Sequence, residues 1–501
     1  LRTFIVYAQH HHLTATRLEQ GFYERSATGD LVSRTINDVN YVRVLFGLGS
    51  LHIVNTAVAY LIILTLMARV SPELTLWALA PYPIFLIVMR LFARAIYHRH
   101  ARKVLLGLAV VKAFSIQNEA SAQFRDASDT YLEANMSLAL VRGAMLPYMG
   151  SIGAIGTLIV LGFGGSLVVE EQITLGEFVE FSAYIVRLAW PTMALGWVIA
   201  LWQRGMAGFD RLCHVLDTEP AIADPQPNDV QHFETSSSGP RGEIVFKDVS
   251  LTYDDGTVAL NDISLTIAAG STVAIVGRTG SGKSSLAQLV PRLRLPTTGS
   301  IHIDGVPVEA LPLAHLRSAI GYAPQTPFLF STTIDENIRF GLLAREASAQ
   351  KQRRPLPPTT LTVDDAIRIA GLTDDIPAFP NGLETMVGER GITLSGGQKQ
   401  RVTIARAVLL DPTILILDDS LASVDTRTER RILDELSRIM QGRTSILITH
   451  RFNALELVDE VIVLHDGRVV ERGPHHELIA QGGTYADMVE RQRLEEELNR
   501  S

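Results

Sequence analysis

The chain has 501 residues, which is enough for two or three domains, and a formal net charge of −8 at pH 7. This negative balance argues against a protein that binds nucleic acid mainly through phosphate contacts. Cys213 is the only cysteine, so an internal disulfide is excluded and a reducing, cytoplasmic side is favoured. Hydrophobic residues make up 47% of the chain. The second half has the pattern of a soluble α/β protein, so the excess apolar character lies in the first half.

Four apolar stretches in the first half are long enough to cross a membrane. A helix of 25 residues is about 37 Å long, and the hydrocarbon layer is roughly 30 Å thick. Buried core helices of a soluble protein would be shorter and usually amphipathic, which disfavours that alternative. The predicted spans are Val44–Ala68, Leu74–Phe92, Ala144–Val169 and Phe178–Trp202.

The basic residues around these stretches predict their orientation. Residues 94–103 follow the second stretch and include three arginines and a lysine, and Arg204 and Arg211 follow the fourth. The turns at 69–73 and 170–177 carry little positive charge. By the positive-inside rule, the basic ends and the second half of the chain are cytoplasmic. The prediction is a multi-pass protein of the cytoplasmic membrane, in contact with lipid.

The connection between the second and third spans has legs of unequal length. As helices, the descending leg (93–106) would be about 21 Å long and the ascending leg (107–143) about 55 Å. Such legs do not form a matched hairpin. Either the lower part of the ascending leg unravels, or residues are missing here.

Polar residues form a stripe on the fourth span. Glu177, Glu180, Tyr184 and Arg187 are spaced 3, 4 and 3 residues apart, which places them on one helical face. Arg187 would lie about 18 Å from Leu175, near the bilayer midplane. The arginine either lines a wet cavity or pathway, or it snorkels or pairs structurally with another helix. The sequence leaves both interpretations open.

A glycine-rich loop in the second half follows an apolar run at 272–276 and precedes a helical pattern. In a phosphate-binding loop, glycines let backbone N–H groups face the phosphates of a nucleotide, and a lysine neutralises their charge. A following serine hydroxyl can reach Mg²⁺. The predicted nucleotide-binding residues are Gly277, Arg278, Thr279, Gly280, Ser281, Gly282, Lys283, Ser284 and Ser285.

Two further apolar runs end in polar side chains. Residues 413–417 are followed by Asp418 and Asp419, and residues 445–449 are followed by His450. Beside a P-loop, carboxylates at the end of a strand hold Mg²⁺ and orient the attacking water. His450 alone would more often be structural. Tyr253, upstream of the loop, is either an ordinary strand aromatic or a side chain that stacks on a purine.

Residues 394–398, Leu-Ser-Gly-Gly-Gln, precede a basic helical run that reaches Arg406. With this motif, the chain resembles a half-transporter of the ATP-binding cassette (ABC) exporter family. The resemblance implies an all-α transmembrane helical domain followed by an α/β P-loop ATPase domain. Residues 217–242 are rich in Pro, Ser, Asp and Asn and mark a linker. The predicted domains are therefore the transmembrane domain at 1–216, the linker at 217–242 and the ATPase domain at 243–501.

The resemblance also implies the function of these motifs: ATP-driven export of a drug, lipid or peptide by a dimer of half-transporters. The partner would be a paralogue or a second copy. The signature residues Ser395, Gly396, Gly397 and Gln398 would complete the ATP site of the opposing subunit, and Tyr253 would stack on adenine. Mg²⁺ would be held by Ser284, Gln325 and Asp418. The residues with catalytic roles would be Lys283, Gln325, Asp419 and His450.

Some features depart from the family pattern. Asp419 stands where hydrolytic members carry glutamate, which predicts slow hydrolysis at this chain's own site. An ATP-binding regulatory subunit therefore remains an alternative. The chain starts at Leu1 without a signal peptide of the usual layout, and it lacks the first membrane helix and most of the second. This favours a chain that begins inside a longer protein, with a defective transporter fragment as another alternative.

Other segments also match or depart from the family. Ser26–Arg34 resembles the cytoplasmic coupling segment, and Met386–Gly391 resembles the exporter loop that touches the membrane domain. Arg345–Leu361 is a basic, proline-rich insertion that predicts a surface loop. A soluble P-loop ATPase of the DNA-repair kind is a further alternative, and the four predicted spans disfavour it.

Overall fold

The computed structural model describes residues 18–25, 28–83, 153–226, 229–231, 241–352, 359–388, 393–449 and 451–500, with scattered positions between 87 and 151. These residues form two compact units. The helical unit comprises Ser26–Thr218. The sheet unit comprises Glu219–Ser501 together with the N-terminal segment Arg17–Arg25.

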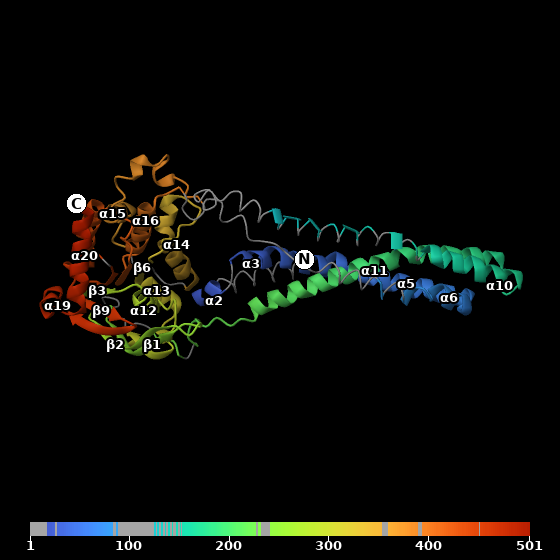
Figure 1. Cartoon of the computed structure of the whole chain (residues 1–501), viewed down its shortest axis with the longest axis horizontal. Helices are drawn as coiled ribbons and strands as arrows, with labels where there is room; N and C mark the ends of the chain where they lie inside the picture. Colours follow the sequence, from blue (N-terminus) through green and yellow to red (C-terminus); the bar gives the residue numbers. More distant parts are fainter. Residues whose placement is uncertain are drawn as a thin grey trace. The chain divides into compact units, whose positions relative to one another are not determined.

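The described part of the helical unit consists of helices, drawn in blue to green in Figure 1. Three of them, η1, η2 and η4, are π-helical turns. In chain order the elements are α3 (Thr28–Ser33), η1 (Arg34–Asp38), α4 (Val39–Val44), η2 (Leu45–Gly49), α5 (Ser50–Val70), α6 (Pro72–Leu79), η4 (Val160–Gly164), α10 (Gly165–Val169) and α11 (Leu175–Leu216).

Apolar composition explains the long helices. Gly29–Val70 is one helix, long and apolar enough to cross a membrane, and Gly153–Val169 is a shorter apolar helix. The helix predicted over Val44–Ala68 is confirmed, and the one predicted over Phe178–Trp202 lies within α11. Most of the legs at 93–143, and parts of the second and third predicted spans, lie outside the described residues.

Capping residues set the ends of these helices. Ser71 ends α5 in an extended conformation, and its Oγ accepts a hydrogen bond from the Leu74 N–H at 3.2 Å at the start of α6. Thr174 and Glu177 form a capping box at the start of α11. Glu177, predicted to belong to the polar stripe, therefore contributes to the helix cap.

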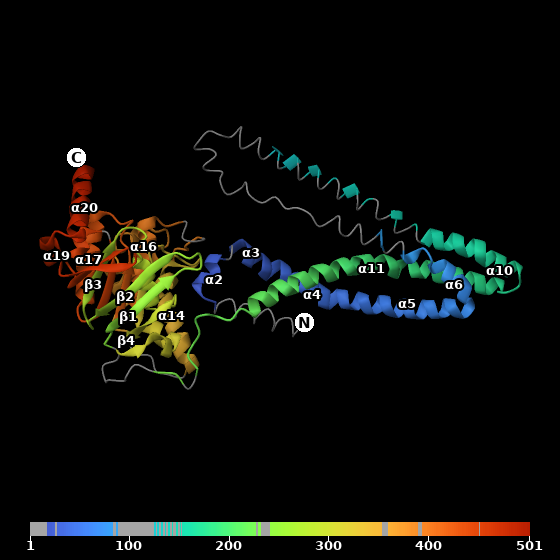
Figure 2. The same cartoon turned by 60° about the horizontal axis from the view of Figure 1, so that its bottom comes forward.

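Small residues let α11 lie close beside α4 and α5, as Figures 1 and 2 show for α5. A Cβ atom on Gly205 would approach a Leu45 side-chain atom to 2.6 Å. Nearby, the buried Asp38 accepts hydrogen bonds from Arg211 Nε at 2.8 Å and Nη2 at 2.6 Å. This paired contact holds η1 against α11.

The sheet unit contains two sheets, whose strands are visible in Figure 2. The four-stranded sheet has the order β2-β1-β4-β5, and the six-stranded sheet has the order β10-β9-β3-β8-β7-β6. The strands are β1 (Ile244–Thr252), β2 (Val258–Ile267), β3 (Thr272–Gly277), β4 (Thr298–Ile303), β5 (Val306–Pro307), β6 (Ile320–Ala323), β7 (Ile414–Asp418), β8 (Thr444–Ile448), β9 (Glu460–His465) and β10 (Arg468–Gly473).

Helices and short 3₁₀ turns surround these sheets. In chain order they are α2 (Gln20–Arg25), α12 (Lys283–Leu289), η5 (Val308–Ala310), α13 (Leu313–Ser318), α14 (Ile334–Gln352), α15 (Val363–Ile369), η6 (Ile376–Ala378), η7 (Gly382–Glu384), α16 (Gly396–Leu409), α17 (Thr426–Met440), α18 (Phe452–Leu455), α19 (His475–Gln481) and α20 (Thr484–Arg500).

The strands β3, β7 and β8 are buried along their whole length and pair in parallel with their neighbours. Their Val-, Ile- and Leu-rich composition is typical of a parallel sheet covered on both faces. Because parallel strands end at the same edge, the loop after β3 and the carboxylates at the end of β7 lie together. The predicted fold class, a helical domain followed by an α/β P-loop domain, is confirmed.

Strand β1 is interrupted by bulges between Phe246 and Val249 and beyond Val249. One local prediction differs from the structure. The predicted loop Arg345–Leu361 is wrong for residues 345–352, which extend α14. Ala, Arg, Glu, Gln and Lys dominate this segment and favour a helix, and the first proline comes only at Pro355.

Candidate nucleotide site

The predicted P-loop forms the turn between β3 and α12. Gly277 ends β3, residues 278–282 form the turn, and Lys283, Ser284 and Ser285 begin α12. Gly282 has φ of +96°, and a Cβ atom there would run into the backbone carbonyl of Ala259. A residue with a side chain would be strained at this position, so glycine permits the turn.

Two buried polar groups of this loop have an unusual environment. Lys283 Nζ donates hydrogen bonds to the carbonyls of Gly277 and Arg278, both at 2.8 Å. Burial lowers the pKa of the Lys283 ammonium, while Asp419 and Asp418 oppose the shift. Ser281 Oγ is buried and has no hydrogen-bond partner within the described part of the chain. A buried hydroxyl without a partner fits a phosphate oxygen as its ligand.

The first carboxylate after β7 lies beside the P-loop serine. Ser284 Oγ donates to Asp418 Oδ1 at 2.9 Å, and the Tyr322 hydroxyl donates to Asp418 Oδ2 at 3.3 Å. Burial raises the pKa of the Asp418 carboxyl, although these two hydrogen bonds oppose the shift. A hydroxyl and a carboxylate at hydrogen-bond distance form an oxygen donor pair that fits Mg²⁺, which takes its other ligands from phosphates and water.

The second carboxylate has a different environment. Asp419 lies in the left-handed region with φ of +44°, which aspartate tolerates better than most residues, and its N–H donates to the Ile448 carbonyl at 2.8 Å. Gln325 Nε2 donates to Asp419 Oδ2 at 3.3 Å. The Gln325 amide therefore contacts Asp419, and Ser284 and Asp418 contact each other. His450 lies outside the described residues.

Tyr253 directly follows β1 and lies against the P-loop helix. Its hydroxyl lies 2.7 Å from Ser285 Oγ. The guanidinium carbon of Arg294 lies over its ring, 4.8 Å from the ring centroid. This places the aromatic ring beside the P-loop, as an adenine-binding side chain requires.

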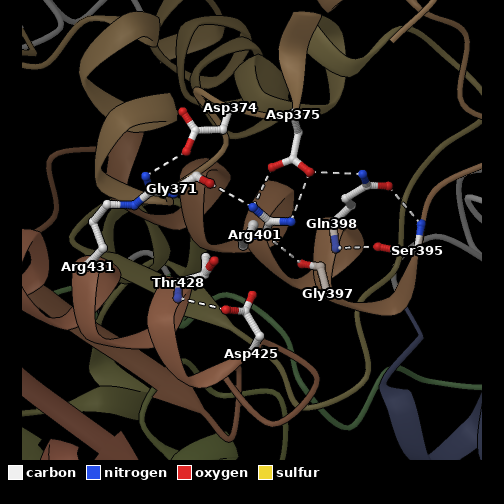
Figure 3. A network of polar contacts seen from close by, with 10 residues as sticks. All are labelled: Gly371, Asp374, Asp375, Ser395, Gly397, Gln398, Arg401, Asp425, Thr428 and Arg431. Carbon is white, nitrogen blue, oxygen red and sulfur yellow. Dashed lines mark hydrogen bonds and ion pairs between the residues drawn. The ribbon is translucent and has the colours of Figure 1, made fainter. Parts of the chain in front are cut away.

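The signature residues begin α16 (Figure 3). Ser395 is the N-cap residue: its Oγ accepts from the Gln398 N–H at 3.2 Å, and its own N–H donates to Gln398 Oε1 at 2.9 Å. Gly396 and Gly397 form the first turn, and a Cβ atom on Gly397 would lie 2.8 Å from the Ser423 carbonyl oxygen. Position 397 therefore requires glycine for close packing.

A mostly buried ion pair holds this helix start, as Figure 3 shows. The Asp375 carboxylate accepts hydrogen bonds from Arg401, including one from Nη2 at 3.1 Å, and from Gln398 Nε2 at 3.0 Å. Arg401 Nη1 also donates to the Gly371 carbonyl at 2.7 Å. In the described residues, no hydrogen bond or ion pair joins α16 to the P-loop.

Sequence reasoning missed three residues that the structure brings to these motifs: Tyr322, Arg294 and Asp375. Each lies far from its partner in sequence, and none belongs to a motif with a local spacing rule. Tyr322 had the clearest signal, since it lies three residues before Gln325, on β6.

The polar stripe of α11 is described in part. The Tyr184 hydroxyl donates to Glu180 Oε1, so these two side chains share a helical face, as predicted. Arg187 is exposed, and no ion pair to it is present among the described residues.

These features define a P-loop ATPase joined to a helical transmembrane domain. The ABC transporter family matches residues 260–422, and the ABC transporter transmembrane region matches residues 14–192. The chain is 37% identical over 489 residues to the "Probable multidrug resistance ABC transporter ATP-binding/permease protein YheI" of Bacillus subtilis (strain 168). This match covers 94% of the chain and 80% of the relative.

Two further comparisons agree. The chain is 35% identical to the "Multidrug resistance-like ATP-binding protein MdlA" of Escherichia coli (strain K12), over 97% of the chain and 81% of the relative. A bacterial Atm1-family ABC exporter with ATP bound has the same fold, with a TM-score of 0.81 and 27% identity over 98% of this chain and 86% of that chain. The chain belongs to the ABC transporter family.

Membership has direct consequences. The chain binds nucleotide and couples ATP hydrolysis to export as a half-transporter. It is a membrane-embedded protein with a cytoplasmic ATPase domain, and its exporter fold implies a dimer with another half-transporter or a second copy.

Proposed function

We propose that this chain exports a drug, lipid or peptide across the cytoplasmic membrane through a multi-pass transmembrane domain at 1–216, which the linker at 217–242 joins to the ATPase domain at 243–501. The partner is a paralogous half-transporter. The observation that carries the proposal is the contact of Ser284 with Asp418 at 2.9 Å beside Lys283, in a chain similar over most of its length to multidrug transporters.

In this proposal, ATP lies between the P-loop of this chain and the signature motif of the partner. Backbone N–H groups of Gly277–Gly282 and the Ser281 hydroxyl bind phosphate oxygens, and Lys283 exchanges its two carbonyl partners for the negatively charged phosphates. Tyr253 stacks on the adenine, and His450 contacts the γ-phosphate. Positioning and charge neutralisation supply most of the catalysis in phosphoryl transfer.

The signature motif serves the partner's ATP in the same way. Ser395 Oγ accepts the Gln398 N–H as the cap of α16, so its O–H proton stays available to donate to a phosphate across the dimer. Gly396, Gly397 and Gln398 are the first three residues of this 14-residue helix, and the N–H groups at its N-terminus favour an anion.

Mg²⁺ would be held by the Ser284 hydroxyl, the Asp418 carboxylate and the Gln325 side chain. The ion would neutralise charge on the β- and γ-phosphates. The described residues contain no cluster of three or more His, Cys, Asp or Glu side chains that could hold a metal. A shared site, completed by phosphates and water, is the arrangement that Mg²⁺ ordinarily takes with nucleotides.

Asp419 is proposed to orient the attacking water with reduced efficiency. Its carboxylate is one methylene shorter than that of glutamate, so it is withdrawn by about 1 Å, and a misplacement of this size costs on the order of 10²-fold in rate. The chain's own site would therefore bind ATP and hydrolyse it slowly, while the partner's site performs most turnover.

For the test, the transporter is purified through a tag on this chain, together with the half-transporter that co-purifies. The purified complex is then reconstituted into lipid vesicles. ATP-dependent uptake of a panel of lipophilic drugs, lipids and peptides should reveal a substrate. Lys283→Ala should abolish photolabelling of this chain by an ATP analogue and reduce uptake, because phosphate charge is no longer neutralised. The exposed Lys247→Ala on β1 is the matched control and should change neither. Wild-type vesicles with no ATP-dependent uptake of any class would contradict the proposal.

A further inference from the structure

The N-terminal segment Arg17–Arg25 packs within the sheet unit, apart from the helical unit that follows it. Leu18 is buried, and Glu19 Oε2 accepts a hydrogen bond from the Ala221 N–H at 3.2 Å. Helix α2 of this segment ends at Arg25, and α3 of the helical unit begins at Thr28. The segment is therefore anchored on the ATPase domain and covalently continuous with the transmembrane domain.

Helix α2 presents a carboxylate to Arg294 of the sheet unit. Glu24 Oε2 forms an ion pair with Arg294 Nη2, and Glu24 Oε1 accepts from Gln20 Nε2 at 3.0 Å. Arg294 Nε donates to Gln288 Oε1 at 2.9 Å, and Gln288 lies on the P-loop helix α12. The Arg294 side chain is only 15% exposed, so its guanidinium is held from two sides.

This fixed guanidinium covers one face of the Tyr253 ring, 4.8 Å from the ring centroid. A cation over an aromatic face is attracted by the negative charge density of that face. The Tyr253 hydroxyl is held at 2.7 Å from Ser285 Oγ, also on α12. The ring is therefore held at its hydroxyl by α12 and on one face by Arg294.

We propose that α2 sets the affinity of Tyr253 for adenine, and that Glu24 acts through Arg294 as a positioning pair. This inference rests on the proposed stacking of Tyr253 on the base. When α2 is docked, Glu24 and Gln288 hold Arg294 on the ring, and the ring is ordered to stack. Without the Glu24 carboxylate, Arg294 keeps Gln288 but loses its anionic partner, and the ring loses part of its support. The effect reaches ATP through the base rather than through the phosphates.

The experiment compares a ligand that has a base with one that has none. The full chain, purified with its partner half-transporter, is labelled with a photoreactive ATP analogue in the presence of Mg²⁺. ATP and inorganic tripolyphosphate then compete for labelling of this chain. Glu24→Gln and Arg294→Met should each lower the affinity for ATP about three- to tenfold and leave the affinity for tripolyphosphate unchanged. The double variant should be no weaker than Arg294→Met alone, because Glu24 acts through Arg294.

The matched control is Arg25→Gln, on the same helix. It breaks the ion pair between Arg25 and Asp254, whose side chains are 55% and 70% exposed, and the longer pair of Arg25 with Glu19 at 3.4 Å. Because Glu19 still accepts the Ala221 N–H, the variant should leave both affinities within about twofold. The inference would be overturned if Arg294→Met lowered the affinities for ATP and tripolyphosphate equally, or if it left the affinity for ATP unchanged. Additive effects in the double variant would also overturn it.

Tyr253→Ala separates this inference from the proposed function. If Tyr253→Ala lowers ATP affinity selectively while Glu24→Gln does not, the adenine contact stands and the positioning role of α2 is wrong. If Tyr253→Ala leaves the ratio of the two affinities unchanged, Tyr253 does not stack on adenine, and both ideas fail together.

Discussion

Two parts of the sheet unit, the P-loop and the start of α16, differ in how their polar groups are satisfied. At the P-loop, Lys283 bonds to its own loop carbonyls, Ser281 Oγ is buried without a partner in the described residues, and burial raises the pKa of Asp418. At the start of α16, Ser395 and Gln398 bond to each other, and Asp375 joins Gln398 to Arg401. The P-loop needs a ligand to satisfy its groups, whereas the signature motif is already built by the chain itself.

The comparison predicts that the largest effect comes from Ser395, since we propose that it presents a preformed group to the partner's ATP. Ser395→Asp keeps an N-cap acceptor for α16 but places a negative charge against the phosphate. We expect turnover at the partner's site to fall about 10²- to 10³-fold, as when one stabilising donor is removed from a transition state. Vanadate trapping of a photoreactive nucleotide, scored on the partner chain, measures this site.

Ser395→Asn serves as the control for folding, since it also caps the helix and adds no charge. Both variants should unfold within a few degrees of the wild type. An aspartate variant with full trapping on the partner chain would show that Ser395 does not face the partner's phosphate.

The second prediction concerns the chain's own site. Asp419→Glu should increase nucleotide trapping on this chain by up to about 10²-fold, since the longer side chain returns the carboxylate to the water. A cost accompanies the gain. Position 419 has φ of +44°, which glutamate tolerates less well than aspartate, so the variant should lose about 1 kcal/mol of unfolding free energy.

Asp419→Asn removes the negative charge of this side chain and so tests the opposite change. A heterodimer with an intact partner site should keep most of its ATPase activity in this variant. If Asp419→Asn abolishes that activity, aspartate is the main catalytic base, and the proposed asymmetry between the two sites is wrong.

The smallest effect is expected at Asp375. Asp375→Asn removes the charge that holds Arg401 and Gln398, and a hydrogen bond to a charged group contributes about 1.5–3 kcal/mol. The loosened start of α16 should lower trapping on the partner chain by about tenfold, and trapping on this chain should change little. Asp374→Asn is the matched control, because the neighbouring Asp374–Arg431 pair is exposed, with side chains 68% and 51% accessible. Equal losses of nucleotide trapping on both chains would show that Asp375→Asn lowers the stability of the transporter in general.

Local patterns predicted the parts of the molecule that obey local rules. The glycine-rich turn, the buried strand β7 and the adjoining aspartates follow from spacing and apolar runs, and the structure has them in contact. Ser395 and Gln398 are three residues apart, and the capping box that the structure shows between them obeys the same kind of local rule.

The parts that were missed depend on contacts between distant segments. Asp375 and Arg401 are 26 residues apart, and Glu24 and Arg294 are 270 apart, so no local period connects them. The error at residues 345–352 has another cause. The segment is both basic and proline-rich, but its helix-forming residues precede the prolines and extend α14.

The place of α2 within the sheet unit has a practical consequence for dissecting this protein. A truncated ATPase fragment starting at the linker would contain every nucleotide motif but would lack Glu19 and Glu24. The Ala221 N–H would lose its acceptor, and Arg294 would keep Gln288 but no carboxylate. Nucleotide constants measured on such a fragment would describe an ATPase domain from which one of its own helices has been cut away.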